Sequence, residues 1–463
     1  MSTDPTVRQQ ALSRMRAAGA SVVRIPVEWR YIVSADPPPG FDASDPGSGA
    51  YDFTAVDAAV RDTVAAGLAP LLVVTRAPAF AEAPNRWPYA YPGSWAPNPL
   101  AFGEFATAVA RRYSGSFPDP LDGGRSLPRV GLYEAWNEPN LARYLEPQWV
   151  VEGGRWRSFS PLLYRELLNA FYAAVKSVQP TATVIASGVA PNGEPAGVGR
   201  MAPVQFLRTL LCLEGSPRVA RGSCPDPPHF DVLAFHPLSF ESPDLAAASS
   251  EDVAIADIAK VTSLLRRAAR ARTVVPDIHK PVWVTELNWE SDPPAAHGVP
   301  GRLQARWISR ALHRLWVAGV GLADWQFLLD PYPGVKLTTP TGGLIELPRP
   351  AGLYSVGPGG GLAGARPKPF LQGFTFPFDP LRVNRGYVRV WALLMHPRQS
   401  VVLQRLVRTR ASPTGVWRAI ARLRANRMAV LNAVVPMRGA AILRLSSGTL
   451  RSASAVISSR REL

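Results

Sequence analysis

The chain has 463 residues, enough to bury a sizeable core, and this length predicts one large barrel or two domains. With 47% hydrophobic and 19% charged residues, the composition excludes a disordered chain, and no run of about 20 apolar residues could span a membrane. The formal net charge is +16, and residues 382–463 supply +15 of it, with 16 Arg, no Lys and one acid, Glu462. This break in charge predicts a domain of residues 1–381 followed by a basic accessory domain of residues 382–463.

The chain opens with a helix signal, because Asp4 and Pro5 suit an N-cap and first turn, and apolar residues recur with helical spacing up to Gly19. A buried strand is predicted next, since an apolar run without polar alternation is bounded by turn residues. The strand pattern occurs seven times, with helical segments between, over residues 21–27, 68–75, 129–138, 182–191, 230–237, 280–288 and 321–329. This alternation predicts right-handed crossovers and a parallel sheet.

Seven strands are one short of a closed (β/α)8 TIM barrel, the α/β fold that we expect. The chain begins on a helix that leads into what would be the second strand, so we expect the first strand, together with an export signal, to lie upstream of Met1. A later segment that closes the ring is the alternative. An open, doubly wound sheet is disfavoured because no glycine-rich phosphate motif follows any strand.

Two predicted strands end in a glutamate, at the edge where parallel barrels carry their reactive groups. One strand ends in Asn137 and Glu138, and the other presents Glu286 in the sequence VTELNW. A carboxylate at a barrel mouth is costly to bury without a partner or a task. Two carboxyl groups about 5 to 5.5 Å apart carry out retaining glycoside hydrolysis, so the pair predicts this chemistry. Two salt-bridged residues on the barrel rim are the alternative.

The sequence resembles the retaining clan-A glycoside hydrolases, the families around 5 and 39 with cellulase-like or xylosidase-like barrels, in VVRIPVEW, WNEP, FHP and VWVTELNWES. The resemblance covers roughly residues 5 to 380 and closes in RPKPFLQGFTFPF. It implies a retaining glycosidase that acts on a β-linked glycan, with Glu138 as acid/base and Glu286 as nucleophile. A catalytically inactive carbohydrate-binding or scaffolding barrel is the alternative.

The same resemblance implies further site residues. Arg24 would lie beside the nucleophile, Asn137 would bind the sugar 2-hydroxyl group, and Trp325 would form the aromatic floor under the reacting sugar. We expect His236 to line this pocket, and a structural histidine is the alternative. Relatives commonly place a Tyr after the His-Pro pair, but this chain has Leu238, so a hydrogen bond from a phenol to the nucleophile must come from elsewhere.

Tryptophans gather at the predicted strand ends and in the loops that follow them. Sugar rings lie with their apolar faces on aromatic planes, so this distribution suits a carbohydrate cleft. The alternative is that the rings pack long loops onto the barrel rim. We expect the stretch from Phe80 to Trp95 to wall a subsite, and the tryptophans predicted to bind substrate, besides Trp325, are Trp29, Trp95, Trp136 and Trp289.

The chain has two cysteines, Cys212 and Cys224, spaced like one small disulfide that closes a loop. Two free thiols are the alternative. With a polysaccharide substrate, a disulfide predicts an extracellular, secreted protein, although no signal peptide is visible in this chain. We predict no cofactor and no metal site, because the six histidines lack a metal-binding spacing and two cysteines cannot complete a tetrahedral site.

From about residue 385 the pattern changes to short alternating runs with Gly and Pro turns, which predicts a small antiparallel β-sandwich. Arg418, Arg422 and Arg424 share one parity in the run VWRAIARLRA, so one strand face is predicted to be basic. That face would suit an anionic cell-surface polymer, such as an acidic polysaccharide, or a nucleic acid. A solvated face that reflects a general preference for Arg over Lys is the alternative. We expect a monomer.

Overall fold

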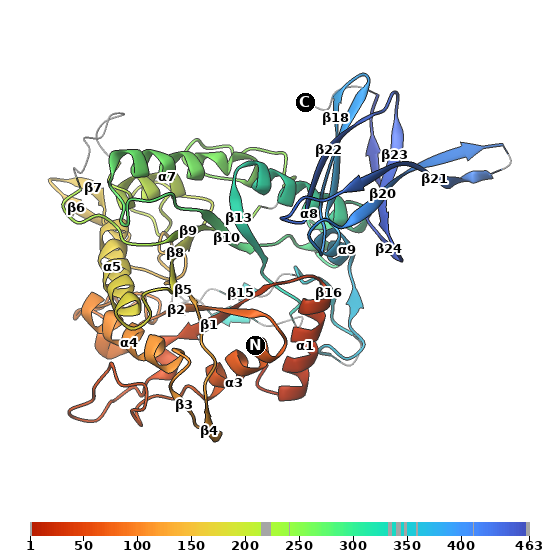
Figure 1. Cartoon of the computed structure of the whole chain (residues 1–463). Coiled ribbons are helices and arrows are strands. Elements are labelled where there is room, and N and C mark those ends of the chain that lie inside the picture. The colour runs from red at the N-terminus through yellow and green to blue at the C-terminus, as the bar shows by residue number, and fades with distance from the viewer. Residues whose placement is uncertain are drawn as a thin grey trace.

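The computed structural model describes residues 2–213, 224–239, 241–331, 336–338, 344–346, 350–357, 360–410 and 412–459. Figure 1 shows a curled α/β body that holds most of the chain and, at the upper right, an all-β body built from its C-terminal part. No helix in the described residues is long and apolar enough to cross a membrane.

One curled sheet of seven parallel strands forms the centre of the first body, in the order β1-β2-β5-β8-β9-β10-β13. The strands are β1 (Val22–Glu28), β2 (Ala69–Thr75), β5 (Leu132–Ala135), β8 (Thr183–Val189), β9 (Val232–Phe235), β10 (Val282–Leu287) and β13 (Val320–Trp325). Each strand lies inside its predicted segment or extends one residue beyond it. Every pairing between neighbouring strands is parallel. The predicted barrel-type α/β fold is confirmed.

Helices connect these strands and cover the outside of the sheet (Figure 1). They are α1 (Pro5–Ala17), α2 (Trp29–Ile32), α3 (Thr54–Ala65), α4 (Pro99–Arg112), α5 (Ser160–Val178), α6 (Pro203–Leu210), α7 (Ala259–Ala271), α8 (Gly301–Val317) and α9 (Pro369–Thr375), with 3-10 turns at Ala79–Ala81 and Ile255–Asp257. The Asp4 side chain accepts hydrogen bonds from the backbone N–H groups of Thr6 and Val7, and so caps α1 as its sequence predicts.

Short two-stranded sheets lie in the loops between these strands and helices. They pair β3 (Pro118–Asp119) with β4 (Asp122–Ser126), β6 (Trp149–Glu152) with β7 (Arg155–Ser158), β11 (Ser291–Asp292) with β12 (Val299–Pro300), β14 (Lys336–Thr338) with β15 (Leu344–Glu346), and β16 (Tyr354–Ser355) with β17 (Arg366–Pro367). The structure also joins Cys212, just beyond α6, to Cys224 by a disulfide.

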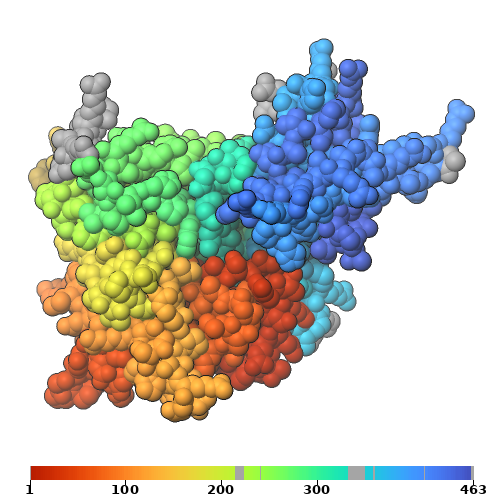
Figure 2. Space-filling model, viewed as in Figure 1, coloured from red at the N-terminus to blue at the C-terminus, as the bar shows by residue number. Residues whose placement is uncertain are grey.

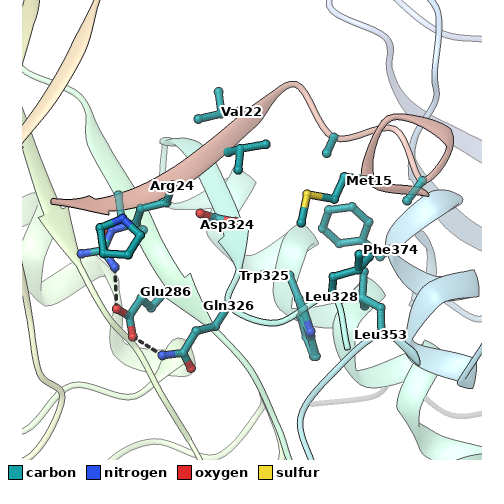
Figure 3. A pocket seen from close by; sticks show the side chains of 15 residues that line it. Met15, Val22, Arg24, Glu286, Asp324, Trp325, Gln326, Leu328, Leu353 and Phe374 are labelled. Atoms are coloured by element: carbon teal, nitrogen blue, oxygen red, sulfur yellow. Dashed lines mark hydrogen bonds and ion pairs between the residues drawn. The ribbon is translucent and has the colours of Figure 1, made fainter. Parts of the chain in front are cut away.

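The two edges of the parallel sheet are β1 and β13, which are not hydrogen-bonded to each other in the described part of the chain. A cavity of about 240 Å³ lies between them (Figure 3). Polar residues, including Arg24 and Glu286, line one end of the cavity, and apolar residues such as Met15 and Phe374 line the other (Figure 3). The ring is therefore open at this place, and our expectation that an upstream strand fills it stays a prediction.

The C-terminal body consists of two antiparallel sheets around a second apolar core. One sheet holds β18 (Phe378–Asn384), β19 (Tyr387–Leu393) and β22 (Val430–Pro436). The other holds β20 (Ser400–Thr409), β21 (Ser412–Arg424), β23 (Ala441–Ser447), β24 (Leu450–Arg451) and β25 (Ala455–Ile457). The predicted accessory β domain is thus present as two antiparallel sheets, and the boundary expected after residue 381 falls inside β18.

The pairing of β20 with β21 corrects the predicted basic face. Leu403 lies opposite Ala421, but its neighbour Gln404 lies opposite Ala419, so Ile420 is an extra residue that forms a β-bulge. The bulge reverses the alternation of side chains along β21. Arg418 therefore faces the opposite side from the two other arginines of the predicted set, Arg422 and Arg424, because parity counts only along an unbroken strand.

The two bodies are joined where α8 packs against β18. Oδ2 of Asp379 in β18 forms a hydrogen bond with Nδ1 of His313 at 2.6 Å. The same oxygen forms an ion pair with Nη1 of Arg310 at 3.1 Å. The His313 ring also stacks on the buried Trp391 of β19, with ring centroids 4.7 Å apart. The interface thus combines a buried charge pair with aromatic packing.

Candidate active site

The backbone that carries Glu138 leaves β5 in a conformation that few residues adopt. Trp136 and Glu138 have φ angles of 75° and 40°, in the left-handed region that L side chains rarely enter. Hydrogen bonds hold the segment there, from the Trp136 N–H to the Val74 carbonyl at 2.8 Å and from the Glu138 N–H to the Gly188 carbonyl at 3.1 Å. Neighbouring strands β2 and β8 therefore fix the position of Glu138.

The two predicted carboxyl groups meet inside the barrel mouth. One oxygen each of Glu138 and Glu286 and one ring nitrogen of His236 all lie within 4.8 Å of one another. Both glutamates are buried, with 8% of each residue exposed. Inverting glycosidases need carboxyl groups roughly 6.5 to 9.5 Å apart to admit a water, and retaining enzymes need about 5 to 5.5 Å. The nearest oxygens of the pair are no more than 4.8 Å apart, which is compatible with the shorter separation.

Arg24 binds Glu286 and two further acceptors from the floor of the site. Its Nη1 lies 2.6 Å from Glu286 Oε1, its Nε lies 2.7 Å from Glu134 Oε2, and its Nη2 donates to Asn137 Oδ1 at 2.7 Å. Burial lowers the pKa of Arg24, but the charges of Glu134 and Glu286 outweigh it and raise the pKa above its ordinary value. A permanent cation thus faces Glu286 and orients Asn137.

The second oxygen of Glu286 accepts a hydrogen bond from Nε2 of Gln326 at 2.6 Å (Figure 3). The side-chain amide of Asn288 donates in turn to the Gln326 carbonyl oxygen. Gln326 follows β13 directly, so an amide from the last strand occupies the donor role that Leu238 leaves open. Glu286 has a donor on each oxygen and is held in one orientation.

His236 connects the two halves of the site. Its Nδ1 lies 3.1 Å from Glu138 Oε1 and its Nε2 lies 3.0 Å from the Thr285 hydroxyl, which donates to Glu134 at 3.1 Å. Since Thr285 gives its own proton to Glu134, the hydroxyl accepts from the Nε2–H of His236. The contact between Nδ1 and Glu138 then needs one more proton. His236 and Glu138 therefore share a proton.

Electrostatics support the same arrangement around His236. Burial lowers the pKa of the imidazole, but the charge of Glu286 and the hydrogen bond to Glu138 outweigh it, so the pKa is raised. The ring fits only because residue 188 is glycine. A Cβ atom at Gly188 would lie 2.0 Å from Nε2 of His236, and the Gly188 N–H donates to Glu134 at 3.0 Å.

Two further ionisable groups lie near the pair. Burial, followed by repulsion from Glu286 and Glu134 and opposed by Arg24, raises the pKa of Asp324 to about 7, and its side chain lines the cavity between β1 and β13. Burial and then the charge of Glu138 raise the pKa of Tyr144 to about 12. The guanidinium of Arg76 lies 4.7 Å from the Tyr144 ring centroid.

The structure brings together five of the predicted site residues, which are Arg24, Asn137, Glu138, His236 and Glu286. Trp325 is 7% exposed, lines the cavity and packs against Phe370 with ring centroids 4.9 Å apart. Sequence reasoning missed Glu134, Thr285 and Gln326. Each is a polar residue inside an apolar strand or just after one, and this is the signal in the sequence that could have identified them.

Three predicted substrate-binding tryptophans need correction, because protein atoms cover their rings. Trp29, Trp136 and Trp289 are at most 1% exposed and belong to the main apolar core. Trp29 stacks on Phe105, and Trp289 contacts Trp307 and Trp325. The rings hold the loops on the barrel, as in the alternative interpretation. Trp95 is half-buried, and the exposed aromatic residues of the predicted subsite wall are Phe80, Trp87 and Tyr89.

Glu138, His236 and Glu286 are also the one group among the described residues whose donor atoms could together hold a metal ion. A metal there would compete with Arg24, which already binds Glu286. The chemistry that this cluster can perform without a metal is proton transfer from one carboxyl group and nucleophilic attack by the other.

A scan of protein-family models finds no match for this chain, and no curated protein sequence matches it. Among solved structures, it is similar to a family 39 glycoside hydrolase from the gut symbiont Bacteroides cellulosilyticus WH2, with 17% identity, a TM-score of 0.53, and 92% of this chain and 78% of that chain covered. It is also similar to a glucosidase from Croceicoccus marinus, with 13% identity, a TM-score of 0.48, and 92% and 89% covered. The first likeness shows that the chain shares the fold of that glycoside hydrolase, which confirms the predicted fold.

Proposed function

We propose that this protein is a retaining glycoside hydrolase that cleaves O-glycosidic bonds of a β-linked glycan by double displacement. The observation that carries the proposal is the approach of Glu138 and Glu286, of which one oxygen each lies within 4.8 Å of the other, in a barrel that shares its fold with a glycoside hydrolase. Fold alone does not set a function, but this geometry matches the chemistry.

In the first displacement, Glu286 attacks the anomeric carbon while Glu138 gives its proton to the leaving oxygen. The bond between that carbon and the leaving oxygen breaks, and an ester bond to Glu286 forms. Arg24 and Gln326 each hold one oxygen of the nucleophile, which supports attack from a single orientation. Asn137, oriented by Arg24, is placed to bind the sugar 2-hydroxyl group as positive charge develops on the ring.

In the second displacement, a water molecule attacks the same carbon from the side that the leaving group has vacated. Glu138 takes a proton from that water, the ester bond breaks, and Glu286 leaves as a carboxylate. The hydrogen bond between Glu138 and His236 supports this exchange, because the imidazole can share the proton in both directions. The configuration at the anomeric carbon is retained overall.

We propose that the α/β body is the catalytic domain and that the β body acts as an accessory domain for an anionic cell-surface polymer. We also propose a monomer that degrades polysaccharide outside the cell, and the disulfide between Cys212 and Cys224 supports the secreted location.

The test is a screen of aryl β-glycosides with the full chain and its variants Glu286→Gln and Glu138→Ala. Glu286→Gln should lower turnover at least about 10⁴-fold, because the nucleophile is removed. Glu138→Ala should keep activity on substrates with good leaving groups, and added azide should speed it and yield a glycosyl azide of retained configuration.

Glu152→Gln, an exposed change on β6, is the matched control and should leave turnover unchanged. Unchanged hydrolysis by Glu286→Gln, or a product of inverted configuration from the unaltered enzyme, would contradict the mechanism. Binding of glycans with no turnover of any substrate would favour the non-catalytic alternative.

A further inference from the structure

Apart from Asp379 in β18, which His313 and Arg310 already contact, the described residues of the C-terminal body have no acidic side chain that could neutralise their positive charge. Residues 382–459 contain 14 arginines and no Asp or Glu. The ion pairs among the described residues join side chains no later in the chain than Asp379. The charge of this body therefore remains available to a partner.

Much of that charge lies on the hairpin of β20 and β21, which we call the arm (residues 400–410 and 412–424). Figures 1 and 2 show it standing out from the rest of the molecule. β20 pairs with β23 only from Val402 to Arg405, so the outer half of the arm is paired only within itself. The exposed arginines of the arm are Arg408, Arg410, Arg418, Arg422 and Arg424.

The β-bulge at Ile420 distributes these charges over both faces of the arm. Arg422 lies opposite Val402 on one face, whereas Arg418 lies opposite Arg405 on the other. Like charges directly across a strand pair are destabilising. Arg405 also donates from Nη2 to the Ala440 carbonyl at 3.0 Å, and an anion bound near the two arginines would relieve their repulsion.

A second group of cations lies where the arm joins β23. The guanidinium of Arg444 lies 4.1 Å from the ring centroid of Trp417 and its Nε donates to Gln404 at 2.9 Å. Burial and then the charge of Arg451 lower the pKa of Arg444, so Arg451 is a further cation near this end of the arm. Arg444 also covers one face of the Trp417 ring.

These features favour one kind of partner. A flat membrane surface can neutralise only one face of the arm, but the charges occupy both. Single-stranded nucleic acid needs open aromatic faces on which bases stack, and Arg444 covers a face of Trp417, the aromatic side chain of the arm. A linear polymer can wrap around both faces and bring one anionic group to each arginine.

We propose that the arm binds a linear acidic polysaccharide through its carboxylate or sulfate groups. The choice of a polysaccharide over duplex nucleic acid rests on the proposed glycosidase function, since an arm that holds an acidic glycan would keep the barrel close to its substrate. Binding at the arm and cleavage at Glu286 take place on different bodies, so that each can be measured alone.

The experiment measures binding of the full chain to polygalacturonate at low ionic strength, and again as salt is added. Fully methyl-esterified polygalacturonate is the uncharged control ligand, and a DNA duplex and phosphatidylglycerol vesicles are the competing classes. We expect binding to polygalacturonate that weakens steeply with salt and is absent with the esterified polymer.

The variant that tests the site changes four exposed arginines of the arm to Gln, and its matched control changes four exposed arginines elsewhere. The arm set is Arg408, Arg418, Arg422 and Arg424, and the control set is Arg125, Arg155, Arg157 and Arg270. The arm variant should bind polygalacturonate about tenfold or more weakly, the control less than about twofold, because only the arm charges contact the polymer. The same four arm residues changed to Lys should retain binding, which guards against misfolding.

No binding of the unaltered chain to polygalacturonate, or equal losses in the two variants, would overturn the proposal. Equal or tighter binding of the DNA duplex or the vesicles would do the same for the choice of partner. Turnover of a small aryl glycoside should be unchanged in the arm variant. Glu286→Gln should lose turnover and keep polymer binding, so failure of the arm and failure of the glycosidase mechanism give different results.

Discussion

In the barrel, Arg112 holds both oxygens of Asp57 at 2.8 and 2.6 Å, and Arg24 contacts two glutamates and an amide at 2.6 to 2.7 Å. In the C-terminal body, the buried Arg382 donates to main-chain carbonyl groups, including that of Met437, and the arginines of the arm face solvent. The same residue type thus builds an ordered interior in one region and an open basic surface in the other. The placement of acids decides which, so the net charge of +16 comes almost wholly from the C-terminal body.

The largest difference between the two regions should appear when one arginine in each is replaced by Gln and the losses of activity and stability are compared. Arg24→Gln leaves Glu134 and Glu286 buried without their cation, so we expect kcat/KM to fall about 10³-fold and the free energy of unfolding to fall by about 3 kcal/mol. Arg422→Gln should change the free energy of unfolding by less than about 0.5 kcal/mol. Urea unfolding and aryl glycoside kinetics measure both. Equal losses in the two variants would remove the distinction between paired and open arginines.

A backbone position in the barrel gives the next effect. Gly188→Ala places a Cβ atom 2.0 Å from Nε2 of His236, so the ring must shift from its place between Glu138 and Thr285. We expect kcat to fall about 100-fold, because the acid/base loses its proton-sharing partner. Gly49→Ala is the matched control, since a Cβ there meets nothing within 4 Å. A crystal structure of the variant with His236 unmoved would contradict the argument.

Titration of Asp324 sharpens the comparison, since charge in the barrel depends on pH and charge on the arm does not. Its pKa is raised from 3.8 to about 7 in the folded chain, chiefly by burial. The folded state therefore binds the proton more tightly than the unfolded state, and this contribution to stability is present below about pH 4 and is lost as pH rises through about 7.

Asp324→Asn removes that dependence. We expect the variant and the unaltered chain to differ most above pH 7, where the variant should be more stable by about 2 kcal/mol, a value reduced from the full linkage because the side chain is partly accessible. Thermal unfolding from pH 4 to pH 8 measures the difference. A constant difference across this range would show that Asp324 keeps the same charge throughout.

The sequence predicts a great deal of the barrel because its signals are local. Apolar runs bounded by turn residues give all seven strands, and a Glu at a strand end identifies Glu138 and Glu286. The side chains that contact these two glutamates depend on the curl of the sheet and on the register of its strands. Local sequence patterns do not predict either. Glu134 looks like one polar residue within a strand until the ring brings Arg24 to 2.7 Å from it.

The tryptophans and the arm show the same limit. A Trp after a strand end can turn into the core or into the cleft, and neighbours decide this. Trp29 turns inward because Phe105 stacks on it with ring centroids 5.3 Å apart. Arg418 was predicted on the wrong face because one extra residue, Ile420, shifts the register of β21.

The smallest effect tests whether Gln326 replaces the phenol that Leu238 leaves out. Gln326→Leu removes the donor 2.6 Å from Glu286 Oε2 but leaves Arg24 on the other oxygen, so Glu286 keeps its counter-ion and loses only part of its orientation. We expect kcat to fall about tenfold with KM little changed, because the amide positions the nucleophile rather than the substrate. Gln372→Leu, an exposed change of the same kind on α9, is the control. If Gln326→Leu raised KM and left kcat unaltered, the amide would be a substrate-binding group, and the orientation of the nucleophile would rest on Arg24 alone.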